Sequence, residues 1–201
     1  MKTPRAVRRF QVLTHDLLLS CGIDQRKRTE DRRILETVIL PYFAERDEYA
    51  RVLFIGCEWY TQGYTKIFEA RDYWTLEIDP AHRRYGAKQH VIAGLQDITR
   101  HFPANGFDLI ICNGVFGWGL NEPNAVEQAF AGCRACLRPG GVFVLGWNDT
   151  IDHCPIPLDD MTSLRSLEPF EFPPLAMSEY LTETVNRHVF RFYRRPQADV
   201  R

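Results

Sequence analysis

The stretch that decides the fold is RVLFIGCEWYTQGY, which occupies residues 51–64. It predicts a short apolar strand over residues 52–57, and Gly56 stands where this strand passes into a loop. A short apolar run without alternation is typical of a strand that is buried on both faces of a parallel sheet. The stretch therefore indicates the first strand of an α/β fold.

Further strands of the same kind follow along the chain, separated by segments long enough for helices. They are predicted over residues 73–78, 90–93, 107–112 and 141–145, and the clearest helix between them over residues 122–137. After several prolines, RHVFRFYR at residues 187–194 alternates and predicts a final, partly exposed strand, with residues 168–172 as its expected partner. We expect a Rossmann-like α/β fold: a doubly wound, mostly parallel sheet with helices on both faces and an antiparallel C-terminal strand.

Two helical segments precede the first strand. The first is predicted over residues 6–20, where Phe10, Leu13 and Leu17 recur at helical spacing. The second is predicted to start near Thr29, a suitable N-cap residue. This pattern predicts an N-terminal helical cap over residues 1–48 and one Rossmann-like domain over residues 49–201.

The composition is that of a soluble globular protein, with 45% apolar and 25% charged residues and a net charge of -1. Residues 1–33 hold nine Lys and Arg against four Asp and Glu. A solvated helix face explains this basic end better than a phosphate-bearing partner does. The longest apolar runs are too short for a membrane span or a secretory signal, so we expect a cytoplasmic protein.

The cysteine pair Cys133 and Cys136 has the spacing of a metal or redox motif. Both residues lie in the predicted helix over residues 122–137, with Cys133 in its apolar stripe, and no second cysteine pair completes a zinc site. We expect them to pack in the core, and we expect no bound metal.

Polar or small residues follow each predicted strand of the parallel sheet. Ligands in such sheets bind outside the carboxyl ends of the strands, near the point where the strand order reverses. The sequence therefore predicts a binding site in the loops that carry the following residues: Gly56, Asp79, Gly94 to Gln96, Asn113 with Gly114, and Trp147 to Asp149.

Four segments, in this order, resemble the class I S-adenosylmethionine-dependent methyltransferases. They are RVLFIGCEWYTQGY (51–64), TLEIDP (75–80), FDLIICNGV (107–115) and LRPGGVFVLGW (137–147). In that family a turn of the Pro139-Gly140-Gly141 type ends a helix before the fifth strand. The resemblance implies S-adenosyl-L-methionine as cofactor and methyl transfer as the activity.

The resemblance also implies which residues bind the cofactor. They are Gly56, Cys57, Glu58, Tyr60, Asp79, Leu95, Gln96 and Asn113. Glu58 and Tyr60 stand where the family's glycine-rich loop has its second and third glycines. Asp79 lies 23 positions after Gly56, which suits a ribose-binding acid, although Asp79 also suits the N-cap of a helix at Pro80 and Glu77 is an alternative ribose ligand.

The acceptor side is predicted on the loop after the fifth strand. His153 and Asp149 are the candidate general bases there, since a neutral imidazole or a carboxylate can take a proton from an acceptor. Aromatic residues expected near the mouth of the site are Trp59, Tyr60, Phe116 and Trp118.

The function predicted first is methylation of a small molecule. The segment at Asn113 lacks the proline-rich motif of enzymes that methylate base amines, which makes a nucleic-acid acceptor a weaker hypothesis. The alternatives are a methyltransferase for a phosphate-bearing or macromolecular acceptor, a cofactor-binding protein without turnover and, more distantly, a nicotinamide oxidoreductase. The sequence does not indicate the oligomeric state.

Overall fold

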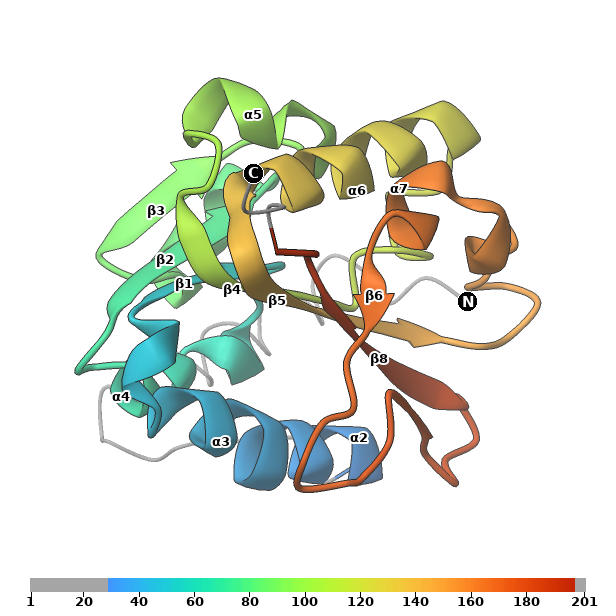
Figure 1. The fold of residues 1–201 in the computed structure, drawn as a ribbon, viewed down its shortest axis with the longest axis horizontal. Helices are drawn as coiled ribbons and strands as arrows, with labels where there is room; N and C mark the ends of the chain where they lie inside the picture. The colour runs from blue at the N-terminus through green and yellow to red at the C-terminus, as the bar shows by residue number, and fades with distance from the viewer. Residues whose placement is uncertain (1–28, 198–201) are drawn as a thin grey trace, which may run out of the picture.

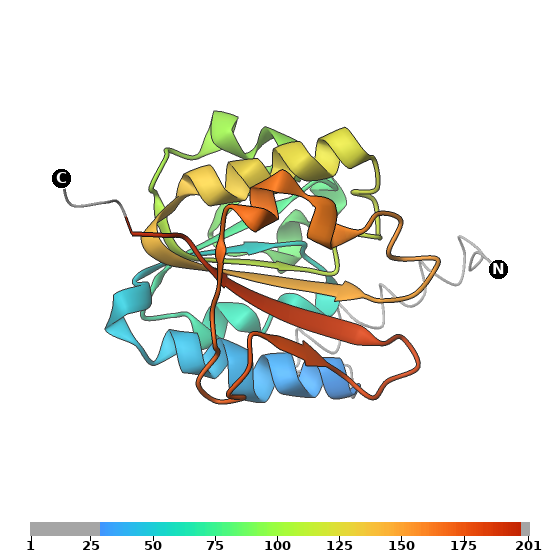
Figure 2. The ribbon, with the colours of Figure 1, turned by 45° about the vertical axis from the view of Figure 1, so that its right-hand side comes forward.

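The computed structural model describes residues 29–197, in which one sheet lies between two layers of helices (Figures 1 and 2). The order of neighbouring strands is β3-β2-β1-β4-β5-β8-β6, and β7 pairs with β8. The first five strands in this order run parallel, and β8 is antiparallel to β5. The strands are β1 (Arg51–Ile55), β2 (Asp72–Glu77), β3 (Gln89–Ile92), β4 (Phe107–Asn113), β5 (Leu137–Asn148), β6 (Glu168–Pro169), β7 (Glu179–Leu181) and β8 (His188–Arg194).

One face of the sheet is covered by the helical segments nearest the N-terminus, and the other face by α5, α6 and α7 (Figure 2). The segment over residues 30–44 is helical throughout, with a π-helical turn in its middle. The helical elements are α2 (Glu30–Ile34), η1 (Leu35–Ile39), α3 (Leu40–Ala44), η2 (Asp47–Tyr49), η3 (Trp59–Thr61), α4 (Tyr64–Ile67), η4 (Pro80–Tyr85), η5 (Leu95–Asp97), α5 (Ile98–His101), α6 (Pro123–Cys136), η6 (Leu158–Asp160) and α7 (Thr162–Arg165).

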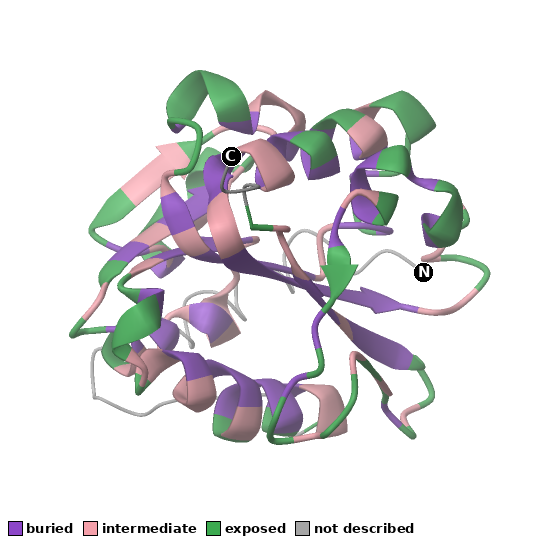
Figure 3. Cartoon of the chain, in the orientation of Figure 1, coloured by how far each residue is buried: buried purple, intermediate pink, exposed green. Residues whose placement is uncertain are grey.

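Two apolar cores result, one on each side of the sheet, and the central strands are buried along most of their length (Figure 3). Alternate residues of each strand point to opposite cores, as the pleat requires. On β4, for example, Ile111 joins the core under α2 and α3, whereas Ile110 and Cys112 join the core under α6. Cys133 and Cys136 are fully buried in this second core, as predicted.

The predicted fold class is confirmed. Thr29 is the N-cap residue of α2, as expected, whereas the helix predicted over residues 6–20 lies outside the described residues. The division between a cap over residues 1–48 and a domain over residues 49–201 stays a prediction. None of the helices within residues 29–197 is long and apolar enough to cross a bilayer.

Two strand predictions were wrong in detail. The fifth strand begins at Leu137 rather than at residue 141, because Pro139 and Gly140 form an irregular step inside β5 instead of a turn before it. Gly140 has a φ of 76°, a conformation that glycine adopts at little cost. The last strand is mostly buried rather than partly exposed, because β8 lies between β5 on one side and β6 and β7 on the other.

Candidate functional site

The strand order reverses between β1 and β4, and a cavity of about 550 Å³ opens at the carboxyl ends of the parallel strands. Its wall takes residues from every parallel strand end, from α2 and from the start of β8. The predicted site residues in this wall are Gly56, Cys57, Glu58, Tyr60, Leu95, Gln96 and Asn113. Three of the predicted residues are not part of it: Asp79, Asp149 and His153.

The loop after β1 depends on glycine at position 56. Gly56 has a φ of +90°, and a Cβ atom there would lie 2.8 Å from the side chain of Val115. An L-amino acid with a side chain would therefore be strained in its backbone and crowded against the loop after β4. The next residue, Cys57, is buried, and burial raises the pKa of its thiol to about 12. Its thiol is neutral at physiological pH.

The two residues that replace glycines in this loop are accommodated by a short 3-10 turn over Trp59–Thr61. Glu58 is the N-cap residue of this turn, and its backbone N–H donates to the hydroxyl of Thr61 at 3.1 Å. The ring of Tyr60 lies against the guanidinium of Arg32, 4.3 Å from the ring centroid. The loop therefore folds without the second and third glycines, and its side chains form part of the cavity wall.

The end of β2 and the loop after it carry two acidic residues with different contacts, Glu77 and Asp79. The carboxylate of Glu77 accepts the backbone N–H of Cys57 at 2.7 Å and that of Asp79 at 2.9 Å, and Glu77 lies in the cavity wall. Asp79 lies outside the wall and accepts the backbone N–H of Ala81 at 2.8 Å, as the N-cap residue of η4. Of the two acidic residues, only Glu77 lies in the cavity wall, and the assignment of the ribose to Asp79 stays a prediction.

Apolar and amide groups line the part of the cavity next to Glu77, at the ends of β2 and β3. Leu95 is buried at the first position of η5, and Gln96 follows it in the wall. Ile78 also lines the cavity and is 67% exposed, so one edge of this side is open to solvent. This part of the wall therefore combines a buried and an exposed apolar side chain with one amide group.

Two charged residues of α2, Asp31 and Arg32, lie in the cavity wall, and Arg32 also contacts Tyr64 of α4 behind it. The guanidinium of Arg32 lies 3.7 Å from the carboxylate of Asp31 and donates to the hydroxyl of Tyr64 at 3.3 Å. That hydroxyl in turn donates to Glu36 at 3.0 Å. Arg32 is only 7% exposed, and both Asp31 and Arg32 line the cavity. Helix α2 thus supplies both a cation and an anion to the cavity wall.

His188, at the start of β8, is buried in the wall between two asparagines. Its Nδ1 lies 2.7 Å from Oδ1 of Asn148, and its Nε2 lies 3.0 Å from Oδ1 of Asn113. Burial lowers the pKa of His188 to about 4, while the charge of Asp31 raises it and that of Arg32 lowers it further. The imidazole is therefore neutral at physiological pH.

The two candidate general bases lie on the loop after β5 and are not among the residues that line the cavity. The imidazole of His153 stacks on Trp118, with 4.2 Å between ring centroids, and its Nδ1 lies 3.1 Å from the hydroxyl of Thr150. The carboxylate of Asp149 forms an exposed ion pair with Arg187 at 2.9 Å. Their predicted catalytic role stays a prediction, and these contacts give each of them a structural partner instead.

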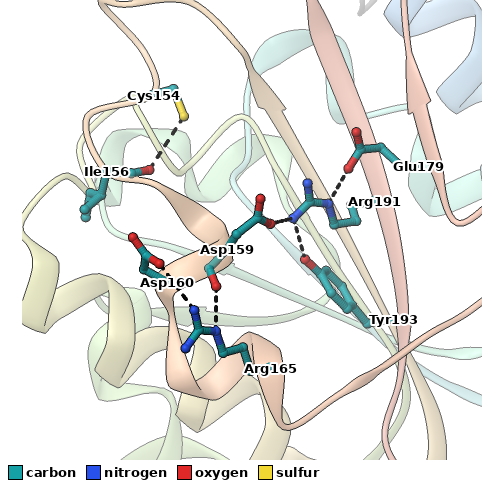
Figure 4. Close-up of polar contacts among 8 residues, drawn as sticks. All are labelled: Cys154, Ile156, Asp159, Asp160, Arg165, Glu179, Arg191 and Tyr193. Carbon is teal, nitrogen blue, oxygen red and sulfur yellow. Dashed lines mark hydrogen bonds and ion pairs between the residues drawn. The ribbon is translucent and has the colours of Figure 1, made fainter.

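The segment that continues this loop is fixed to the sheet by an arginine of β8. Arg191 donates to Asp159 of η6 at 2.6 Å and also to Glu179 of β7 and to the hydroxyl of Tyr193 (Figure 4). None of these four residues lines the cavity. The cluster therefore holds the chain between β5 and β8 in place, outside the site.

The aromatic residues predicted near the mouth divide into two groups. Trp59, Tyr60 and Trp118 line the cavity, and Trp118 is 60% exposed. Phe116 is fully buried and packs on Phe130 of α6. Only the first group is available to a ligand.

Arg32 and His188 line the cavity but were not predicted as site residues, although the sequence pattern around each of them indicates burial. Arg32 precedes Leu35 and Ile39 by three and seven residues, so it belongs to the buried stripe of its helix. His188 alternates with Phe190 and Phe192, so it points to the same buried face of β8. A polar residue in such an apolar stripe indicates a buried hydrogen-bond network.

The chain is similar to known methyltransferases in sequence pattern and in structure. A family model described as a methyltransferase domain matches residues 55–145. The N-methyltransferase NodS from Bradyrhizobium japonicum WM9 is similar in structure, with a TM-score of 0.58, 19% identity and coverage of 81% of this chain and 95% of that chain. No curated protein sequence matches the chain.

A second solved structure is similar over almost the whole chain. It is a TehB-like SAM-dependent methyltransferase from Corynebacterium glutamicum ATCC 13032 Kitasato, with a TM-score of 0.60, 18% identity and coverage of 97% of this chain and 100% of that chain. At such identities the likeness shows a shared fold.

Proposed function

We propose that this chain, whose residues 55–145 match a methyltransferase domain, uses S-adenosyl-L-methionine to methylate a small molecule inside the cavity at the carboxyl ends of its strands. The observation that carries the proposal is the size of that cavity. At about 550 Å³ it lies within the range of about 300–1,000 Å³ that small-molecule sites occupy. The cofactor fills much of such a volume, which leaves room for a compact acceptor.

The ribose of the cofactor is assigned to Glu77. Its carboxylate is held in the wall by two backbone N–H groups, and a carboxylate retains further lone pairs that can accept from ribose hydroxyls. The two backbone bonds also fix its orientation before a ligand arrives. The part of the cavity beside Leu95 and Gln96 then takes the adenine.

The amino-acid end of the cofactor is assigned to the pair on α2. This end carries a carboxylate and an ammonium group, and Arg32 and Asp31 offer the opposite charges from adjacent positions in the wall. A guanidinium binds a carboxylate through charge-assisted hydrogen bonds. The side chain of Arg32 also approaches Gly114, so this end lies against the loop after β4.

The chemistry of the step needs little from the protein beyond placement. Bound S-adenosyl-L-methionine supplies a methyl group that is already activated on a sulfonium. The chain's own residues hold the acceptor in line, and Trp59 and Trp118 restrict water at the mouth of the cavity. His153 and Asp149 do not line the cavity, so we assign catalysis to the positioning of the acceptor rather than to a general base.

The proposal is tested by screening acceptors with the purified protein. Formation of S-adenosyl-L-homocysteine is measured with small amines, alcohols, thiols and carboxylic acids, and separately with RNA and with peptides. We expect turnover with a member of the small-molecule set, and we expect Glu77→Gln to reduce it at subsaturating cofactor. Turnover with RNA or peptide alone would favour a macromolecular acceptor, and tight cofactor binding without turnover in any set would favour a binding protein.

A further inference from the structure

The guanidinium of Arg32 connects two elements of the cavity wall, α2 and the loop after β1. Its Cζ atom lies over the ring of Tyr60, 4.3 Å from the ring centroid. Arg32 is only 7% exposed, and both residues line the cavity. An aromatic face attracts a cation, and the attraction is stronger where water is excluded. The contact with Tyr60 therefore helps to hold the side chain of Arg32 in the wall.

This contact does not use the hydrogen-bond donors of Arg32. The N–H groups of a guanidinium lie in its plane, whereas the ring contacts its face. Within the plane, Nη1 donates to the hydroxyl of Tyr64 at 3.3 Å, and Nε lies 3.7 Å from the carboxylate of Asp31. Nη2 lies 4.0 Å from the place that a Cβ atom would take at Gly114. The ring thus fixes the guanidinium without competing for the donors that a carboxylate ligand needs.

The ring of Tyr60 is itself held by the short turn over Trp59–Thr61. The backbone N–H of Glu58 donates to the hydroxyl of Thr61 at 3.1 Å, and this hydroxyl donates to the backbone carbonyl of Glu58 at 2.8 Å. Trp59 packs edge-on against Tyr60, with 5.1 Å between the ring centroids. The ring therefore has its position from contacts within its own loop, before a ligand arrives.

Tyr60 stands where the glycine-rich loop of class I methyltransferases has its third glycine. A glycine has no side chain, so it would leave the face of Arg32 without this contact. Arginine has many rotamers, and a ligand that must first order such a side chain binds more weakly. The tyrosine at this position therefore favours binding through Arg32 in a way that a glycine does not.

We propose that Tyr60 is a positioning residue, whose ring holds the guanidinium of Arg32 in the orientation that receives the carboxylate of the cofactor. Tyr60 acts on this carboxylate through Arg32 and does not contact it. The inference rests on the proposed function, which assigns the amino-acid end of the cofactor to Arg32 and Asp31. It adds a role for the side chain that replaces a glycine in the loop after β1.

The test compares two ligands that differ only in the amino-acid end. S-adenosyl-L-homocysteine carries this end, whereas 5′-deoxy-5′-methylthioadenosine keeps the adenosine and the sulfur but lacks it. Both affinities are measured by calorimetry for the wild type, Tyr60→Leu, Tyr60→Phe, Arg32→Met and the double variant of Arg32→Met with Tyr60→Leu. Leucine removes the aromatic face, and phenylalanine keeps it.

The matched control is Tyr42→Leu. The guanidinium of Arg46 lies over the ring of Tyr42, 3.6 Å from the ring centroid, and neither residue lines the cavity. This variant therefore removes the same kind of contact at a place that the cofactor does not reach, and it should change neither affinity.

Tyr60→Leu should weaken the binding of S-adenosyl-L-homocysteine by about fivefold or more, and Tyr60→Phe should keep it within about twofold of the wild type. The affinity for 5′-deoxy-5′-methylthioadenosine should stay within about twofold in both variants, which also shows that they are folded. In the Arg32→Met background, Tyr60→Leu should cause almost no further loss, because both substitutions remove the same interaction.

Three results would overturn the inference. They are an unchanged affinity for S-adenosyl-L-homocysteine in Tyr60→Leu, an equal loss for both ligands in that variant, and a full further loss when Tyr60→Leu is added to Arg32→Met. The first shows that the ring has no effect, the second that it only shapes the loop or contacts the adenosine, and the third that it acts without Arg32. An unchanged affinity for S-adenosyl-L-homocysteine in Arg32→Met, or a wild type that binds neither ligand, would instead contradict the proposed function.

Discussion

Replacing Glu77 with Gln should weaken cofactor binding far more than any change at Asp79. The carboxylate of Glu77 accepts two backbone N–H groups, from Cys57 and Asp79, and lies in the cavity wall. Glutamine keeps the size but loses the charge, and because the two N–H groups contact different oxygens of Glu77, one of them would face the NH₂ group of glutamine. A hydrogen bond to a charged group contributes about 1.5–3 kcal/mol, so losing one to the ribose should raise the Kd by about 10-fold to 150-fold.

Calorimetry with S-adenosyl-L-homocysteine measures the effect, and Asp79→Asn is the matched control. The carboxylate of Asp79 only caps η4, so this variant should bind within twofold of the wild type. An analogue without the two ribose hydroxyls makes the test specific. This analogue should bind the wild type weakly. The Glu77→Gln substitution should weaken its binding almost no further, because the variant and the analogue remove the same interaction.

The reverse ranking would refute this reasoning. If Asp79→Asn weakens binding tenfold while Glu77→Gln does not, the ribose contact belongs to Asp79 and the observed cap is secondary. Thermal unfolding of both variants shows whether a loss of binding reflects a loss of folded protein.

Three further predictions concern the loop after β1, His188 and His153. Gly56→Ala should lower the free energy of unfolding by about 1–3 kcal/mol, because Gly56 has a φ of +90° and a Cβ atom there would crowd Val115; unchanged urea unfolding would contradict this. Burial lowers the pKa of His188 to about 4. Since the unfolded pKa is about 6.5, the unfolded chain takes up the proton first, and the free energy of unfolding should fall by about 1 kcal/mol per unit as the pH drops below 6.5. Urea unfolding from pH 7 down to 4.5 should show that this part of the pH dependence is missing in His188→Phe. His153→Ala should slow turnover of an acceptor by less than tenfold, because His153 stacks on Trp118 outside the wall and a general base is worth about 10²–10⁴-fold.

The fold could be predicted because its signals are local. Apolar runs such as the one before Gly56 mark strands that are buried on both faces, and their alternation with helices leaves few topologies. The start of β5 was missed because Pro139 and Gly140 are typical of a turn, and only the pairing of Leu137 with Phe107 extends the strand across them. That pairing joins residues far apart in the chain.

The site could be predicted only where it depends on strand ends. Gly56 and Asn113 follow apolar strands, and both line the cavity. Arg32 and His188 lie on elements from opposite ends of the chain, and only the folded sheet brings them to the same wall. The choice between Glu77 and Asp79 also depended on the folded structure, since Asp79 caps η4 and Glu77 lies in the cavity wall.

The central claim is that this cavity binds S-adenosyl-L-methionine, and one calorimetric titration tests it most directly. The purified protein is titrated with S-adenosyl-L-homocysteine and, in a separate experiment, with NAD. We expect one molecule of S-adenosyl-L-homocysteine to bind per chain, and we expect no heat with NAD. Clear binding of NAD without any binding of the sulfur nucleotide would contradict the account.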